Sequence, residues 1–377
     1  MSKKILITGG AGFIGSHLAL KLAGKGYTVT VLDNLSHQIH GTDGDSFLFR
    51  SIKDKVHFIK GDVRERADWL KALQDQAIVV HLAAETGTGQ SMYEIEKYID
   101  VNIRGTAILL DLITGKKCSI RKIVLASSRA IYGEGKYRCP DHGDVFPVHR
   151  KESDLLKKDF NVKCPVCSRD VDLLSTDEDS KIHPQSIYGI TKETQEQLLS
   201  VALNSLKIPY SILRYQNVYG PGQSLSNPYT GILSIFSTRI KNNKDLNIFE
   251  DGVESRDFIY IDDVTEATQL AIEKKEADYE IFNVGTGMPV SVLEVAQSLK
   301  KVFQSNIKIA ISGHFRLGDI KHNYADISRI KEKLKFTPKY DFQTGLMKFS
   351  SWVDTQKIQA DHYDRSIQEM KEKGLYK

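Results

Sequence analysis

Short apolar runs alternate with longer helical stretches along the first half of the chain. The apolar runs are rich in β-branched residues and have the length of buried strands. Each run ends in a small or polar residue, and stretches such as 93–113 between the runs have helical length. This alternation predicts an α/β fold with a doubly wound parallel sheet, whose ligands bind at the carboxyl ends of the strands. The predicted strands are 4–8, 27–32, 56–60, 78–82 and 123–126.

A glycine-rich turn follows the first predicted strand. Gly9, Gly12 and Gly15 precede the apolar positions of a helix, which is the order of a Rossmann dinucleotide site. Glycine lets the backbone approach a pyrophosphate, and the helix amino terminus offers it free amide groups. Asp33 ends the second strand, 18 residues beyond Gly15. Its carboxylate can bind the adenosine ribose and would repel a 2′-phosphate, so NAD is favoured over NADP. A Rossmann sheet without a nucleotide is the alternative.

The alternation ends after Gly222, and the remaining chain is predicted to build a smaller lobe. We expect 1–223 to form the NAD-binding Rossmann domain, with 255–275 returning to its sheet. Segments 224–254 and 276–377 would then form a substrate-binding lobe, and the cleft would lie between the two parts. The lysine-rich helix 361–373 is expected to cap this lobe with its lysines in solvent.

Tyr188 and Lys192 are four residues apart, which places both side chains on one face of a helix. A nearby ammonium favours the phenolate, so we expect Lys192 to lower the pKa of Tyr188 and make it a proton acceptor near neutral pH. Ser128 could hydrogen-bond the same substrate hydroxyl. By itself, the short Tyr-x-x-x-Lys pattern is also compatible with an ordinary surface helix.

A cysteine-rich insert, 134–182, separates the candidate serine from the candidate tyrosine. It carries two close-spaced ligand pairs, Cys139 with His142 and Cys164 with Cys167, which could close a tetrahedral zinc site. His149 is an alternative fourth ligand. Because the insert is polar and too small for a large core, a structural zinc would hold it folded as a zinc-ribbon-like module. The alternative is a flexible loop with reduced thiols, and Cys118 is expected to be such a free thiol.

Charge and hydropathy narrow the partners of the protein. A net charge of +4 without a basic block does not indicate nucleic acid, and residues 137–180 hold seven Lys and Arg against ten Asp and Glu. We therefore expect the insert to be a lid or an oligomer contact. No apolar run approaches the roughly 18 residues of a membrane span, and the amino terminus lacks a signal-peptide pattern. A cytoplasmic location is expected.

Motifs in a specific order and spacing run through nearly the whole chain. They are 8–15, 32–36, 81–84, Asn102, 127–128 with 132–133, Tyr188 with Lys192, 213–222, 256–264, 282–287 and 316–319. Together they resemble the extended short-chain dehydrogenase/reductases, in particular nucleotide-sugar epimerases such as UDP-galactose 4-epimerase. The insert, taken with 84–93, is also similar to bacterial epimerases of dTDP-L-rhamnose at carbon 4.

The resemblance implies roles for individual residues. The catalytic residues would be Ser128, Tyr188 and Lys192. Tyr188 and Lys192 would also contact the cofactor, together with Gly9, Gly12, Phe13, Ile14, Gly15, Asp33, Asn34, Ser36, Asp62, Val63, Leu82, Ala83, Ala84, Asn102, Tyr215 and Val218. Substrate would meet Thr86, Ser128, Asn217, Arg256 and Arg316, the two arginines at its diphosphate.

The family chemistry also implies a reaction and its alternatives. Tyr188 would take the proton of a sugar hydroxyl as hydride leaves the same carbon for NAD, and return of the hydride to the other face would give the 4-epimer. The 4,6-dehydratases of the family carry an Asp-Glu pair where this chain has Arg129 and Ala130, so dehydration is not expected. A 4-reductase, a UDP-sugar 4-epimerase and a cofactor-sensing regulator are the alternatives. A homodimer is the usual assembly of the family.

Overall fold

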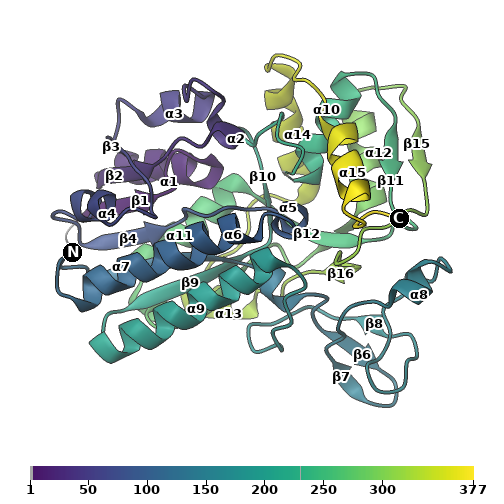
Figure 1. Ribbon diagram of the computed structural model, residues 1–377, viewed down its shortest axis with the longest axis horizontal. Coiled ribbons are helices and arrows are strands. Elements are labelled where there is room, and N and C mark those ends of the chain that lie inside the picture. The colour runs from purple at the N-terminus through teal and green to yellow at the C-terminus, as the bar shows by residue number, and fades with distance from the viewer. Residues whose placement is uncertain (1–2, 230) are drawn as a thin grey trace.

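The computed structural model describes residues 3–229 and 231–377. Its centre is a seven-stranded parallel sheet in the order β13-β9-β5-β4-β1-β2-β3 (Figure 1). Each of the five strands predicted from the first half is present to within two residues at either end. The strands are β1 (Lys4–Thr8), β2 (Thr28–Asp33), β3 (His57–Lys60), β4 (Ile78–His81), β5 (Lys122–Ser128), β9 (Tyr210–Tyr215) and β13 (Glu280–Val284).

Helices cover both faces of this sheet, because the side chains of each strand alternate between two separate cores. Ile5 and Ile7 of β1 point into one core and Leu6 into the other. The first core is covered by α1 (Phe13–Gly24), α11 (Ile261–Glu273) and α13 (Ser328–Leu334). The second is covered by α4 (Arg66–Ala72), α7 (Gly105–Thr114) and α9 (Ile187–Leu206).

The predicted helix 93–113 is interrupted. It consists of α6 (Ile95–Tyr98), a π-helical turn (Ile99–Arg104) and α7. The extra residue in each turn of a π-helix changes the direction in which side chains leave the helix, and such turns are frequent at functional sites. Here the turn carries the buried side chain of Asn102 toward the chain after β4.

A second region lies beside the sheet and has its own core, which includes Phe236, Phe258, Leu299 and Phe349. It holds a four-stranded sheet and a two-stranded one. The strands are β10 (Asn217–Tyr219), β12 (Ser255–Tyr260), β14 (Pro289–Ser291) and β16 (His322–Asn323), with β11 (Leu246–Ile248) and β15 (Ile309–Ile311). The helices are α10 (Ile232–Lys241), α12 (Val292–Val302), α14 (Phe342–Asp354) and α15 (Tyr363–Glu372).

Two segments pair differently from the expected arrangement. The range 255–275 was expected to return to the main sheet, but β12 pairs with β10, β14 and β16, and only α11 packs on the parallel sheet. Conversely, β13 lies within the range expected for the second lobe and forms the edge strand next to β9. Both differences arise because β-strand pairing joins residues far apart in the sequence, and the sequence of a short strand does not indicate its partner.

The insert forms a small unit of its own at the side of the molecule (Figure 1). Strands β6 (Tyr137–Cys139), β7 (Gly143–Val145) and β8 (Asp172–Leu173) form an antiparallel sheet, with the single turn α8 (Glu152–Leu155) nearby. One small buried cluster of the insert comprises Tyr137, Val145, Val162 and two cysteines, and Leu155 and Phe160 form another with Phe315 of the second region. Within residues 3–229 and 231–377, none of the helices combines the length and the apolar character needed to span a bilayer.

Candidate active site and metal centre

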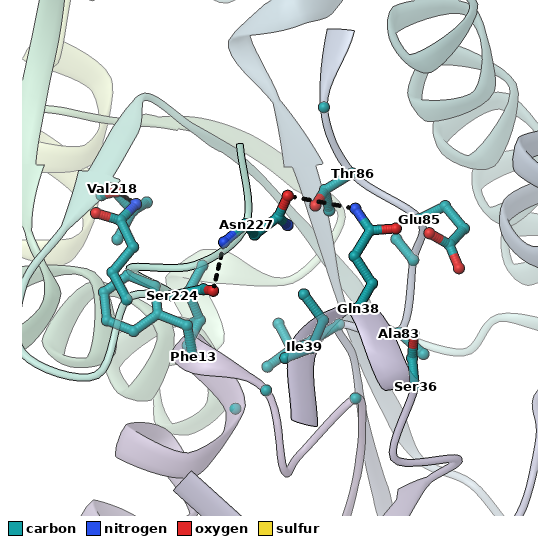
Figure 2. Close-up of a pocket in the computed structure, with 18 of the residues that line it drawn as sticks. Phe13, Ser36, Gln38, Ile39, Ala83, Glu85, Thr86, Val218, Ser224 and Asn227 are labelled. Carbon is teal, nitrogen blue, oxygen red and sulfur yellow. Dashed lines mark hydrogen bonds between the residues drawn. The ribbon is translucent and has the colours of Figure 1, made fainter. Parts of the chain in front are cut away.

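A cavity of about 760 Å³ opens at the carboxyl edge of the parallel sheet. In Figure 2, Phe13, Ala83 and Thr86 lie around it, and Gln38 reaches Asn227 through a hydrogen bond of 3.4 Å. Most of the predicted site residues line this cavity. They are Gly9, Gly12, Phe13, Ile14, Gly15, Asp33, Asn34, Ser36, Asp62, Val63, Leu82, Ala83, Ala84, Thr86, Ser128, Tyr188, Lys192, Tyr215, Asn217 and Val218.

The glycine turn after β1 has the shape that a pyrophosphate requires. Gly9 has a φ of +67°, and a Cβ there would stand 2.8 Å from the amide nitrogen of Ala83. A Cβ on Gly15 would stand 2.2 Å from the carbonyl oxygen of Gly9. No side chain caps the first turn of α1, so its amide groups are left to face the cavity. The turn therefore fits the phosphates of a dinucleotide.

Two carboxylates stand where an adenosine would lie. Asp33 accepts hydrogen bonds from the amides of Ala11 and Leu35, which orients its carboxylate at the cavity wall. Asp62 is bonded by Asn34 at 3.1 Å and by Arg64 at 2.8 Å. Burial raises the pKa of Asp62, but the bonds from Arg64 and Asn34 outweigh it and lower that pKa to about 2. Both carboxylates are therefore fixed at the cavity wall by hydrogen bonds within the protein.

Ser128, Tyr188 and Lys192 converge on the same cavity from β5 and α9. Ser128 is the last residue of β5, and its side chain hydrogen-bonds that of Tyr188. Ser186 caps the helix by accepting a bond from the amide of Gly189, so Tyr188 stands in the first turn of α9. One helical turn later, the Lys192 ammonium lies 6.0 Å from the centroid of the Tyr188 ring.

The electrostatics of this trio differ from the expectation that Lys192 lowers the pKa of Tyr188. Burial raises the pKa of Tyr188, while the bond from Ser128 and the charge of Arg129 lower it in part. The ammonium of Lys192 donates instead to the carbonyl oxygen of Ala126 at 2.9 Å. Burial lowers its own pKa to about 7, against a rise from the charge of Glu196. Desolvation therefore dominates both groups in this structure.

A buried polar network that the sequence motifs did not reveal supports the trio from below. Arg214 and Glu196 form a two-point ion pair, with nitrogen to oxygen distances of 2.7 and 3.0 Å. Arg214 also donates to the hydroxyl of Tyr132 at 2.8 Å, and the hydroxyl of Ser127 bonds Glu196. Such a network fixes the ends of β5 and α9 relative to each other. Its only sequence signal is a charged residue inside an otherwise apolar strand.

Side-chain amides at the cavity wall offer unused hydrogen-bonding capacity. In the part of the chain that the structure describes, Oδ1 of Asn217 and both polar atoms of the Gln216 amide are buried without a hydrogen-bond partner. Buried polar groups are rarely left this way, but these atoms have almost no accessible surface, so a ligand in the cavity could reach them only after the side chains moved. Asn217 was predicted from the family pattern, whereas Gln216 was not.

Three predicted residues are missing from the described lining: Asn102, Arg256 and Arg316. Asn102 instead bonds both backbone groups of Glu85, with a 2.8 Å bond from the Glu85 amide, and so positions the chain after β4. Arg256 donates to the carbonyl oxygens of Ser255, Ile320 and Lys321. Arg316 bonds the carboxylate of Asp319 beside a second, much smaller cavity.

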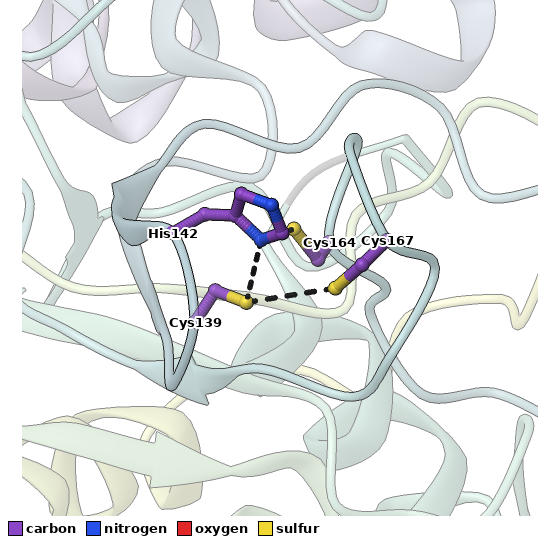
Figure 3. A group of neighbouring side chains, drawn as sticks. All are labelled: Cys139, His142, Cys164 and Cys167. Carbon is purple, nitrogen blue, oxygen red and sulfur yellow. Dashed lines mark hydrogen bonds between the residues drawn. The ribbon is translucent and has the colours of Figure 1, made fainter.

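Cys139, His142, Cys164 and Cys167 form a compact group in the insert (Figure 3). Their ligand atoms all lie within 4.8 Å of one another. The sulfurs of Cys139 and Cys167 are 3.7 Å apart, and Nδ1 of His142 is 3.4 Å from Cys139 and 3.8 Å from Cys164. Bonds of about 2.3 Å to sulfur and 2.0 Å to nitrogen in a tetrahedron imply edges of roughly 3.5–3.8 Å. The group therefore fits zinc, and the exposed His149 lies outside it.

The insert is anchored to the second region by buried charges. Arg150 pairs with Glu250 at 2.6 Å, and its Nε lies 3.3 Å from Glu134. Glu134 in turn accepts the backbone amide of Lys321 at 2.9 Å. No described residue in 134–182 lines the large cavity, so the expected lid is not what the insert forms here. These ion pairs hold it at the side of the molecule instead.

Known proteins resemble this chain both in sequence and in structure. The sequence matches the model of the NAD dependent epimerase/dehydratase family over residues 5–152 and 168–285. The chain belongs to this family. It is thus an enzyme of the NAD-dependent nucleotide-sugar epimerase family, which confirms the resemblance carried by the sequence motifs. The unmatched stretch 153–167 holds Cys164 and Cys167, so these two ligands lie outside the family pattern.

Individual family members resemble the chain over most of its length. A dTDP-L-rhamnose 4-epimerase of Burkholderia thailandensis is 36% identical over 353 residues, which cover 93% of this chain and 95% of the relative. The structure of a UDP-glucose 4-epimerase of Thermotoga maritima with UDP-glucose superimposes with a TM-score of 0.77 at 30% identity, covering 93% and 98% of the two chains. A UDP-glucuronic acid 4-epimerase of Bacillus cereus, with UDP-glucuronic acid and NAD, gives 0.76 at 28%, covering 93% and 99%.

Proposed function

We propose that this protein is an NAD-dependent nucleotide-sugar 4-epimerase that acts through a transient 4-keto sugar. The observation that carries the proposal is the convergence of Ser128, Tyr188 and Lys192 on the cavity that also holds the glycine turn and Asp33. A proton acceptor and a dinucleotide site thus share one enclosed space. The cofactor proposal is further supported by the NAD in the Bacillus cereus relative.

In the proposed mechanism, Tyr188 as phenolate accepts the proton of the C4 hydroxyl, and Ser128 holds the same oxygen by a hydrogen bond. When bound, NAD accepts the hydride from C4 and returns it to either face of the keto sugar. Lys192 would contact the nicotinamide ribose, while the hydrogen bond from Ser128 and the charge of Arg129 favour the phenolate of Tyr188. Rotation of the keto sugar in the cavity before the hydride returns gives the epimer, with no net redox change.

For the substrate we propose a dTDP-6-deoxyhexose such as dTDP-L-rhamnose. The Burkholderia thailandensis relative, named for that reaction, supports this choice over nearly the full chain. Arg129 and Ala130 occupy the positions at which dehydratases of the family need acid and base side chains, which disfavours dehydration. A UDP-sugar 4-epimerase is the second candidate, favoured by the likeness to the Thermotoga maritima structure with UDP-glucose.

We propose a structural zinc ion for the Cys139, His142, Cys164 and Cys167 group. The insert's buried cluster is too small to hold three short strands by hydrophobic burial alone, and a metal would supply the missing free energy. We also propose that the cofactor is bound by the 1–223 part and the substrate mainly by the second region, as the sequence division suggests.

A homodimer is proposed from exposed apolar side chains on neighbouring helices. Ile95, Ile99, Ile190 and Val201 are exposed by 44 to 74% on α6, the π-helical turn and α9, which pack against one another. Apolar groups gathered in this way favour burial against another chain. Light scattering should give the mass of two chains, and a Val201→Glu, Ile99→Glu double variant should give one.

A substrate panel tests the proposed function directly. Purified protein with NAD and no reductant should convert one of a set of dTDP-, UDP-, GDP- and CDP-sugars into its C4 epimer, as seen by NMR. Epimerisation of UDP-sugars alone would select the second candidate. Oxidation of reduced cofactor in step with product would identify a reductase instead. A protein that binds NAD but turns over no sugar of the panel would contradict the proposal and favour a regulatory role.

A further inference from the structure

Arg129 is the first residue of a tight helical turn, Arg129–Tyr132, which directly follows the catalytic serine. The hydroxyl of Ser128 accepts a 3.2 Å bond from the amide of Ala130, which fixes the backbone on both sides of Arg129. The same turn packs so closely on α9 that a Cβ at Gly189 would stand 2.6 Å from the carbonyl oxygen of Ala130. Arg129 is therefore held next to Tyr188 and lines the large cavity with it.

The guanidinium of Arg129 has no partner of its own. Within residues 3–229 and 231–377, it makes no hydrogen bond and no ion pair, unlike Arg256 and Arg316, which are bonded to carbonyl or carboxylate oxygens. Burial lowers the pKa of Arg129 to about 9, so the group remains charged at neutral pH. An enclosed charge without a counter-charge is costly, and proteins retain one mainly where a ligand completes it.

The charges around Arg129 indicate what kind of ligand is missing. The charge of Arg256 lowers the pKa of Arg129, so the two guanidinium groups repel each other. Asp319 is near, but its carboxylate is bonded by Arg316 with a nitrogen to oxygen distance of 2.5 Å. Glu134 is bonded by the amide of Lys321 and faces Arg150. An oxyanion in the cavity at the Arg129 guanidinium would offset this repulsion without displacing these acids.

We propose that Arg129 is a substrate-binding residue that pairs with the sugar-linked phosphate of the nucleotide sugar. The proposal rests on the proposed function, since it requires a nucleotide sugar in the cavity. Tyr188 would meet carbon 4 of the sugar, and Arg129 lines the same cavity on the turn that follows Ser128. Every nucleotide sugar carries a phosphate at the other end of the ring from carbon 4, and a guanidinium fork suits its oxygens.

This assignment gives Arg129 a role that the sequence pattern alone did not suggest. In the sequence, Arg129 and Ala130 stand out only because the dehydratase acids are absent. In the structure, the same position supplies a cation to the wall of the cavity that Tyr188 also lines. Arg129 would bind the phosphate from the same turn that follows Ser128, so that phosphate binding also orients carbon 4 against Tyr188.

Titration of nucleoside diphosphates tests the inference without any turnover. Isothermal titration of dTDP and UDP into the full chain with saturating NAD would be compared for wild type, Arg129→Met, Arg129→Lys and the control Arg66→Met. Arg66 is an exposed arginine on α4 that pairs with Asp111. We expect Arg129→Met to raise both dissociation constants by at least about ten-fold, and Arg129→Lys by less, because a charge-assisted bond is lost in the first and only the fork in the second. Arg66→Met should bind as wild type does.

The possible outcomes separate this inference from the function proposed above. Unchanged dTDP and UDP binding by Arg129→Met, with an unchanged melting temperature, would overturn the role of Arg129 and leave the epimerase proposal standing. A wild type that binds neither diphosphate would overturn both. UDP-glucose and UDP-glucuronate give a further comparison: a loss confined to UDP-glucuronate would overturn the phosphate assignment and point to a sugar carboxylate.

Discussion

The cavity and the cysteine-rich insert hold their functional side chains by different means. Around the cavity, the side chains stand at the ends of strands and helices that are fixed by two large apolar cores, so their positions do not depend on a ligand. In the insert, one candidate metal ligand lies on β6 and the other three lie in turns and loops, and two of the four belong to a cluster of only five buried residues. The fold around the cavity keeps its side chains in place, whereas the metal ligands themselves would have to stabilise the insert.

Because of this difference, substitutions in the two sites should affect different properties of the protein. A change among the cavity residues alters chemistry or binding while the sheet persists, because each side chain contributes little to the cores. A change among the metal ligands removes a bond that the insert cannot replace by hydrophobic burial. Among the contacts that link the insert to the rest of the molecule, Arg150 pairs with Glu250, and Arg214 beneath the cavity donates to the carbonyl oxygen of Glu178.

The largest expected effect is on the cavity side of the comparison. Tyr188→Phe should lower kcat for epimerisation by at least about 100-fold, because it removes the proton acceptor and leaves the ring in place. Thermal unfolding and NAD binding should remain as in wild type. Tyr279→Phe, at an exposed position, serves as the control. Measurable turnover within a few-fold of wild type would refute the role of Tyr188.

A substitution of a metal ligand should change the structure of the insert and leave cofactor binding intact. Cys164→Ser should remove the bound zinc and open residues 134–182 to proteases, while NAD binding by the sheet persists. Metal analysis by mass spectrometry and limited proteolysis would follow the two effects, with Cys118→Ser as the matched cysteine control. Wild-type protein purified without chelators should carry about one zinc per chain. A zinc-free wild type with a protease-resistant insert would contradict the metal site.

A smaller effect concerns how the cavity tunes its proton acceptor. Burial raises the pKa of Tyr188 and the bond from Ser128 lowers it, so Ser128→Ala should raise that pKa further. Because the phenolate is the active form, the acid limb of the kcat profile should move to higher pH by about one to two units. Ser200→Ala on the outer side of α9 should not move it. A Ser128→Ala profile that falls in height without shifting would contradict this tuning.

The smallest expected effect is on the stability of the protein and concerns the buried charge of Lys192. Burial lowers the pKa of Lys192 to about 7, whereas the unfolded chain keeps it near 10.4. Between these values the unfolded state binds more protons, so this group adds stability as pH rises and costs stability at and below neutral pH. Lys192→Met should therefore raise the melting temperature by roughly 1–3 °C at pH 6 to 7, and by less near pH 10. Differential scanning fluorimetry would measure it, and a lower melting temperature at pH 6 would oppose this reading.

Prediction from the sequence succeeded where the pattern is local. The five strands, the glycine turn and the Tyr188 and Lys192 pair were each predicted from a few adjacent residues, and the structure places them as expected. The pairing of β12 and β13 was not predicted, because strands of five or six residues can pair with any free edge. The ion pair of Arg214 with Glu196 joins β9 to α9, and although the charge inside an apolar strand is a local signal, its partner was not predictable from neighbouring residues.

The sequence by itself determined the order of strands and helices, the residue at each strand end and the four metal-ligand types, because these depend on neighbouring residues. Only the tertiary structure sets the pKa of Tyr188 by burial rather than by Lys192, holds the insert at the side of the molecule without lining the cavity, and leaves Arg129 at the cavity wall without an ion-pair partner among the described residues. The physical reason is that pKa values and ion pairs depend on burial and on distances between distant segments, and only the folded chain sets these.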